Sequence, residues 1–124
     1  MEHALAVESD GRFIISTINR GSAEGIIAFL EAIVSHPSWQ PSNHILLDHR
    51  KLEIADITVE AIDRVLHHFQ KIAHRLGNGK IALVMKKDID FGIARAWEFT
   101  TNEHVDMQIG VYRSLDEARM WSRQ

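Results

Sequence analysis

Residues 44–61, HILLDHRKLEIADITVEA, decide the fold class of this chain. A short apolar run, Ile45–Leu47, ends in the polar residues 48–50, and a polar connection then leads to a helical pattern that starts at Thr58. A brief apolar run followed by a helical period is typical of a buried parallel strand and the crossover helix after it. The same unit recurs at Lys80–Glu98 and at Met107–Trp121.

Near the start of the chain, an Asp10-Gly11 turn joins two strand-like runs, Ala4–Glu8 and Arg12–Ile18, which predicts an antiparallel hairpin. We therefore expect an α/β fold with a single, mainly parallel sheet and the element order β-β-α-β-α-β-α-β-α. Both faces of the run 12–18 are largely apolar, so this strand should be covered on both sides. Residues 107–113 alternate between apolar and polar, which predicts a half-exposed edge strand.

Helix boundaries follow from capping residues and breakers. Ser22 is a candidate N-cap of a first helix that ends before Pro37. The apolar period of the second helix runs from Val59 to Leu76 without interruption, and the third helix should begin at Asp88 or Asp90. In the loop-like residues 36–43, Trp39 is expected to fold back over a helix end.

The bulk composition bounds the function. A chain of 124 residues with 45% hydrophobic and 25% charged residues predicts one domain over residues 1–124. The formal net charge of -3 argues against general nucleic-acid binding, and the absence of cysteine excludes disulfides and thiolate chemistry. No apolar run reaches the ~18 residues of a membrane helix, and the acidic start is unlike a signal peptide, so we expect a cytoplasmic protein without integral membrane association.

Basic residues follow the predicted parallel strands and indicate where a ligand would bind. Ligands of open α/β sheets bind beyond the carboxyl ends of the strands. The residues at these ends are Asp48, His49, Arg50 and Lys51, then Lys86, Lys87 and Asp88, and finally Arg113 and Ser114, with Arg95 of the third helix expected near the same edge. One interpretation is recognition of an anion by this edge. The alternative is that these cations only solvate the ends of buried strands.

Thr58 and the histidines each allow two interpretations. Thr58 is predicted to cap the second helix, and an exposed hydroxyl there is also a possible phosphorylation site. His67 and His74 share a helix face, but cations flank them and no HxxxH or HxH pair exists, so we predict neither a metal site nor a cofactor.

Known catalytic motifs are absent from the chain. There is no Gly-x-Ser-x-Gly, no phosphate-binding glycine-rich loop and no Gly-x-Gly-x-x-Gly. Asp48 could act as a base, but no nucleophile or second carboxylate is visibly paired with it. We therefore predict that the chain is not an enzyme, with a hydrolase or transferase built around Asp48, His49 and Arg50 as the alternative.

With these residues laid out, the chain resembles the SpoIIAA-like, or STAS/CRAL-TRIO-like, family of small bacterial proteins of unassigned function. The resemblance covers nearly the whole length. Its matching pieces are His36-Pro37 with Trp39, Leu47-Asp48-His49-Arg50 with Leu52, Lys80-Ile81-Ala82, Phe91-Gly92-Ile93-Ala94-Arg95 with Trp97-Glu98, and Tyr112–Ala118 with Trp121.

The wider fold group implies two functional models. In anti-sigma-factor antagonists a strand ending in Asp leads to an Asp-Ser-Ser-Gly motif whose second Ser is phosphorylated. Asp48 and Asp56 match the two Asp positions and Thr58 falls on the phosphorylated one, but Ile57-Thr58-Val59 replaces Ser-Ser-Gly. The second model is a lipid carrier, in which the helix around Trp97–Phe99 would form one wall of the ligand site.

These considerations leave three hypotheses. The leading one is a non-enzymatic binding or regulatory domain that contacts a protein partner through the strand-end edge and the Asp88–Phe99 helix. The second is a carrier of a small apolar or amphipathic, lipid-like molecule, and the third is the enzyme described above. A homodimer is expected if one side of the sheet or the outer face of the Asp88–Phe99 helix stays apolar.

Overall fold

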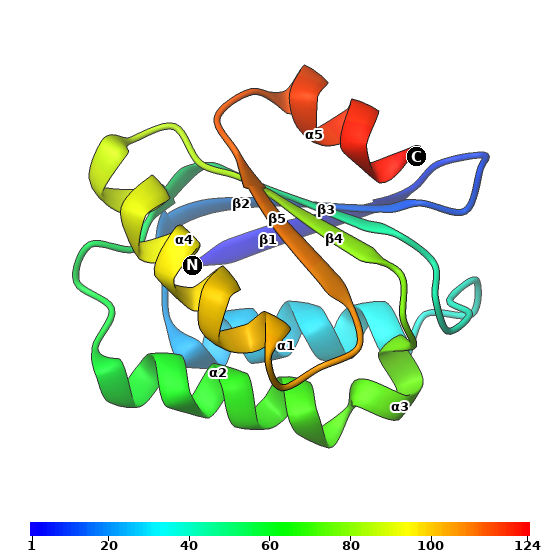
Figure 1. The fold of residues 1–124 in the computed structure, drawn as a ribbon, viewed down its shortest axis with the longest axis horizontal. Coiled ribbons are helices and arrows are strands. Elements are labelled where there is room, and N and C mark those ends of the chain that lie inside the picture. Colours follow the sequence, from blue (N-terminus) through cyan, green and yellow to red (C-terminus); the bar gives the residue numbers. More distant parts are fainter.

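The computed structural model describes residues 1–124 and contains one five-stranded sheet with helices on both faces (Figure 1). The strands are β1 (Glu2–Val7), β2 (Phe13–Arg20), β3 (Ile45–Glu53), β4 (Lys80–Val84) and β5 (Gln108–Tyr112). The helices are α1 (Ala23–Val34), α2 (Val59–Lys71), α3 (Ala73–Leu76), α4 (Asp88–Asn102) and α5 (Leu115–Ser122). The strands lie in chain order, with β1 antiparallel to β2 and the other pairs parallel. The predicted α/β architecture is confirmed.

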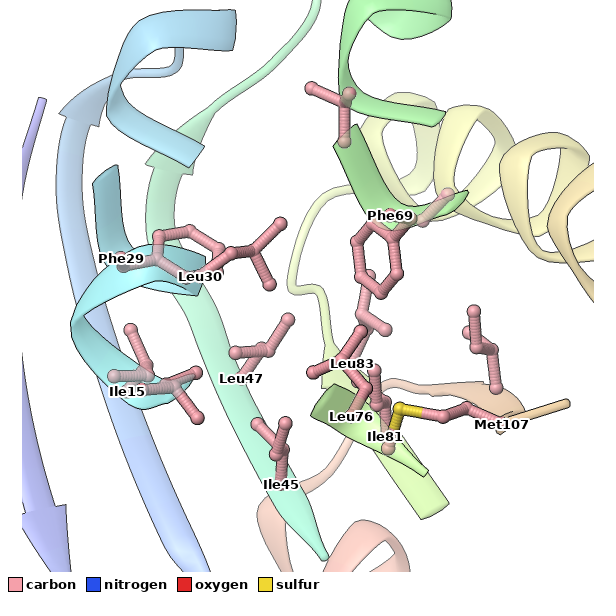
Figure 2. Packing of buried hydrophobic residues seen from close by; sticks show 14 of the residues in the cluster. Ile15, Phe29, Leu30, Ile45, Leu47, Phe69, Leu76, Ile81, Leu83 and Met107 are labelled. Carbon is pink, nitrogen blue, oxygen red and sulfur yellow. The ribbon is translucent and has the colours of Figure 1, made fainter. Parts of the chain in front are cut away.

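The helices divide the molecule into three layers. α1, α2 and α4 cover one face of the sheet, and α5 covers the other (Figure 1). Between the sheet and the three helices lies a cluster of 22 buried hydrophobic residues, in which Phe29 and Phe69 point from the helices toward Leu47 and Leu83 of the sheet (Figure 2). A smaller cluster of four buried residues packs under α5. Because the larger cluster fills the α1/α2/α4 side, that side holds most of the buried apolar surface.

A buried arginine ties the hairpin to α5. Arg12 is only 3% exposed, donates from Nε to Glu8 Oε1 over 2.7 Å, and donates from Nη1 to Ser122 Oγ over 2.8 Å. Arg119 completes the group with a 3.1 Å ion pair to Glu8. A buried guanidinium is tolerated only when it is paired and hydrogen-bonded, and here the partners come from both ends of the chain.

The prediction of one continuous helix over Val59–Leu76 is wrong. The helix bends at Ile72 (φ -103°, ψ 9°), which separates α2 from α3. The loop 36–43 holds the end of α3, because Trp39 Nε1 donates to the carbonyl of Arg75 over 2.8 Å and Ser42 N donates to that of Leu76 over 2.8 Å. The expectation that Trp39 folds back over a helix end is therefore met.

Two predictions about sheet coverage are also wrong. β2 lies inside the sheet, but its Ser16 and Ile18 are exposed, because α5 lies over β3, β4 and β5 and leaves that part of β2 uncovered. β5 is the expected edge strand but is not half-exposed. Residues 109–111 are all buried, because α4 packs on one side of β5 and α5 on the other. No helix is both long enough and apolar enough to span a membrane.

Candidate functional site

A cavity lies between the sheet and helices α1, α2 and α4. The hollow measures about 640 Å³ when its solvent-open part is included, and centres of water-sized groups can occupy about 70 Å³ of it. Of its 17 lining residues 16 are hydrophobic, among them Phe29, Leu47, Phe69, Leu83 and Trp97. Such a concave and largely apolar site is typical of small-molecule binding.

A β-bulge in β3 shapes the sheet side of the cavity. The pairing of β2 with β3 shifts after Ser16, which lies opposite Asp48, so that Ile18 lies opposite Lys51. The additional residue reverses the alternation of β3, as expected for a bulge. As a result Leu52 and Ile54 are buried and line the cavity. Without the bulge, Leu52 would face away from the cavity, because it lies an odd number of residues after Leu47, which faces the cavity.

His49 is the one polar residue of the cavity wall. Its side chain is almost fully buried, and Nδ1 lies 2.6 Å from Thr17 Oγ1 on β2. Thr17 Oγ1 is also 3.3 Å from the carbonyl oxygen of Asp48, to which it can donate. Burial lowers the pKa of His49 to about 4, against an opposing effect of the Asp48 charge. The imidazole is therefore neutral at pH 7, and Nε2 makes no hydrogen bond within the chain.

An aromatic pair spans the gap between α2 and α4. The rings of Phe69 and Trp97 meet edge to face with centroids 5.3 Å apart. Such pairs add about 0.5–1.5 kcal/mol beyond the apolar area that they bury. The Nε1 atom of Trp97 is buried and has no acceptor in the chain. The expectation that the Trp97–Phe99 segment forms a wall applies to Trp97, whereas Phe99 is 73% exposed.

The basic residues after the parallel strands lie at one edge of the sheet. Asp48 is opposite Val84, and Val84 is opposite Tyr112. Lys86 and Arg113 therefore lie just past the carboxyl ends of β4 and β5, whereas Arg50 lies within β3, two residues beyond the position that pairs with Val84. The prediction that the third strand ends at Asp48–Lys51 is wrong, because pairing with β2 beyond the bulge carries β3 on to Glu53.

Most of these cations are already paired within the chain. Arg50 binds both carboxylate oxygens of Asp48 over 2.8 Å, and this pair holds the pKa of Asp48 below its usual value. Lys87 lies 3.7 Å from Glu53, Arg95 lies 3.0 Å from Glu98, and Arg113 pairs with Asp88 and stacks on the Phe91 ring. Lys51 and Lys86 have no ion pair. Anion recognition at this edge stays a prediction, with less free positive charge than the sequence suggested.

The sheet separates the residues of the alternative enzyme site. Asp48 and Arg50 bind each other on one side of β3, and the intervening His49 points to the cavity on the other side. The three side chains therefore do not converge on a common point.

Thr58 acts as the predicted helix cap. Its Oγ1 accepts from the amide of Ala61 over 3.1 Å at the start of α2. The hydroxyl lies at the surface. Phosphorylation of Thr58 stays a prediction.

Inspection of the sequence did not identify Thr17, Phe69, or Leu52 and Ile54 beyond the bulge, as parts of the site. One signal was present, because Ile45, Leu47 and His49 alternate along one strand and should share its inward face. That pattern places His49 among core residues rather than at the rim.

The fold is shared with a known structure. The chain superposes on an uncharacterized protein of the DUF3478 family with a SpoIIAA-like fold from Shewanella loihica PV-4, with a TM-score of 0.63 and 13% sequence identity. The match covers 98% of this chain and 92% of that chain. This chain has a SpoIIAA-like fold. The resemblance noted from the sequence is therefore confirmed at the level of the fold. No protein-family model and no curated protein matches the chain.

Proposed function

We propose that this SpoIIAA-like chain binds a small apolar or weakly amphipathic molecule in the cavity between the sheet and α1, α2 and α4. The observation that carries the proposal is the composition of the cavity wall, 16 hydrophobic residues and one histidine. Burial of apolar ligand surface against such a wall is favourable by about 25 cal/mol per Å². This function is the carrier hypothesis drawn from the sequence, and the cavity favours it over recognition at the strand-end edge.

The wall also restricts the polar part of the ligand. No lysine or arginine lines the cavity, and His49 is neutral at pH 7 because its pKa is lowered to about 4. A buried carboxylate or phosphate would lose its hydration without gaining a counter-ion, at a cost of several kcal/mol. The expected ligand is therefore uncharged where it is buried, such as an alcohol, aldehyde or ester, with one group that hydrogen-bonds to His49.

A matched pair of substitutions tests the proposal. Ala61 lines the cavity, whereas Ala28 is exposed on α1. The probe is N-phenyl-1-naphthylamine, a neutral apolar fluorophore whose emission rises when it leaves water. We expect Ala61→Leu to weaken probe binding by at least about tenfold by filling the site, and Ala28→Leu to leave it unchanged. Absence of binding to the unaltered chain, or equal binding by both variants, would contradict the proposal.

The proposed role involves binding without catalysis. It is supported by the separation of Asp48 and Arg50 from His49 across β3. A general base must lie within hydrogen-bond reach of its partner groups. Screening of hydrolase and transferase substrates, in parallel with His49→Gln, tests this part; turnover that disappears in the variant would overturn it.

A second candidate function, contact with another protein, is favoured by the outer face of α4. Ile89 is 60% and Phe99 is 73% exposed there. The leading hypothesis drawn from the sequence placed the contact on the strand-end edge and the Asp88–Phe99 helix. The present proposal places it on the outer face of that helix, α4, alone. Hydrogen–deuterium exchange of the backbone amides tests it. We expect the amides of α4 to exchange more slowly at high protein concentration or in a complex with a partner.

A further inference from the structure

The outer face of α4 carries an apolar stripe with the spacing of a helix–helix contact. Ile89, Gly92, Ala96 and Phe99 recur at intervals of three, four and three residues, and all four are exposed. Residues at these intervals lie on one side of a helix. We call these four residues the α4 stripe. In Figure 1, α4 runs along the outside of the molecule, and no other element covers its outward side.

The α4 stripe is complementary to itself when two copies run in opposite directions. A large residue stands at each end, Ile89 and Phe99, and the two smallest residues, Gly92 and Ala96, lie between them. In an antiparallel pair, Ile89 of one copy meets Phe99 of the other, and Gly92 meets Ala96. A Cβ atom added at Gly92 would have no neighbour within 4 Å, so space for a second helix is open there. Small central residues let two helix axes approach closely.

The charges beside the stripe select the same orientation. Lys86 precedes α4, Glu103 follows it, and both side chains are exposed and free of ion pairs within the chain. Antiparallel packing brings Lys86 of each copy toward Glu103 of the other, whereas parallel packing would place like charges together. Opposite helix ends also attract through their dipoles.

From these observations we infer that the chain forms a two-fold symmetric homodimer through antiparallel packing of the α4 stripe. The two-fold axis passes near the middle of α4, which makes the contact isologous. The inference rests on the second proposed function, protein contact through α4, and is independent of ligand binding in the cavity. The opposite side of α4 contributes Ile93, Ala94 and Trp97 to the cavity, so one helix would serve both surfaces.

Sedimentation velocity over a range of protein concentrations tests the dimer. We expect a monomer–dimer equilibrium that Phe99→Glu weakens by at least about tenfold. The control is Val59→Glu, because Val59 is 71% exposed on α2 and lies outside the stripe. A monomer at every concentration, or equal effects of both substitutions, would overturn the inference.

Charge reversal tests the orientation. Lys86→Glu and Glu103→Lys should each weaken the dimer on the order of tenfold, and the double variant should restore it. Failure of the double variant to recover would overturn the antiparallel arrangement. Circular dichroism checks folding, and fluorophore binding is measured on the same proteins. Fluorophore binding by an unaltered chain that stays monomeric at every concentration would overturn the dimer alone, whereas an unaltered chain that dimerises without binding the fluorophore would overturn the cavity proposal alone.

Discussion

Thr17 Oγ1 lies 2.6 Å from His49 Nδ1, and this contact joins two buried polar side chains on the neighbouring strands β2 and β3. It occupies one ring nitrogen of His49 and leaves Nε2 for a ligand. A buried polar group without a partner is costly, so Thr17 makes it possible to place an imidazole in an otherwise apolar wall. The contact thereby holds the one polar residue of the cavity wall in place.

The first prediction concerns stability at acidic pH. Burial lowers the pKa of His49 to about 4 from 6.5. Above pH 6.5 the imidazole is neutral in both the folded and the unfolded chain. Between pH 6.5 and 4 only the unfolded chain takes up the proton. The free energy of unfolding therefore falls as the pH is lowered through this range. This loss should approach about 3 kcal/mol near pH 4. Urea unfolding from pH 4 to 7 should show a weaker pH dependence for His49→Gln than for the unaltered chain. A constant difference between the two proteins would contradict the assignment.

The second prediction is that Thr17 and His49 are energetically coupled. Thr17→Val keeps the shape of the side chain but leaves Nδ1 of His49 without a partner, which should cost about 1–3 kcal/mol of unfolding free energy. In a His49→Leu background the same change should cost clearly less, because no buried imidazole remains. A double-mutant cycle by urea unfolding measures the coupling. Additive effects would show that the 2.6 Å contact contributes nothing to stability.

A third prediction compares two glycines. Gly77 has a positive φ of 80°, and a Cβ there would lie 2.5 Å from the backbone nitrogen of Ser42. Gly77→Ala should therefore destabilise the chain by about 2–4 kcal/mol. Gly92 lies inside α4 with open space around it, so Gly92→Ala should stabilise the fold by about 0.5–1 kcal/mol. Chemical unfolding at low protein concentration measures both changes, and equal signs would contradict the structure.

The fourth prediction locates the ligand by tryptophan fluorescence. Trp97 lines the cavity, whereas Trp121 packs against Tyr112 on the opposite face of the sheet. Bound N-phenyl-1-naphthylamine should quench Trp97 most strongly. Trp97→Phe should therefore remove most of the quenching that the probe causes, and Trp121→Phe should remove little. Similar losses in both variants would place the probe outside the cavity.

The fold could be predicted because its signals are local. Short apolar runs at Ile45, Ile81 and Met107 mark the strands, and Thr58 marks the start of α2 by its capping side chain. The position of Lys86 and Arg113 just past the carboxyl ends of β4 and β5 follows from parallel strands alone. Each of these inferences needed only the order and spacing of residues along the chain.

The cavity could not be predicted, because it depends on pairings between distant residues. The bulge opposite Ser16 and Ile18 changes which residues of β3 face inward, and nothing in the residues around Arg50 signals it. The pairing of Arg113 with Asp88 and of Lys87 with Glu53 likewise depends on how the strand ends meet in space. Sequence inspection therefore overestimated the free charge of the edge and assigned His49 to it.

Native mass spectrometry of the freshly purified chain tests the central claim, that the cavity holds a small uncharged apolar molecule. The account predicts a complex whose additional mass is released on denaturation and identified as a neutral, largely apolar compound, with less of it retained by Ala61→Leu than by Ala28→Leu. Recovery of the bare chain mass alone, after N-phenyl-1-naphthylamine has also failed to bind, would contradict it.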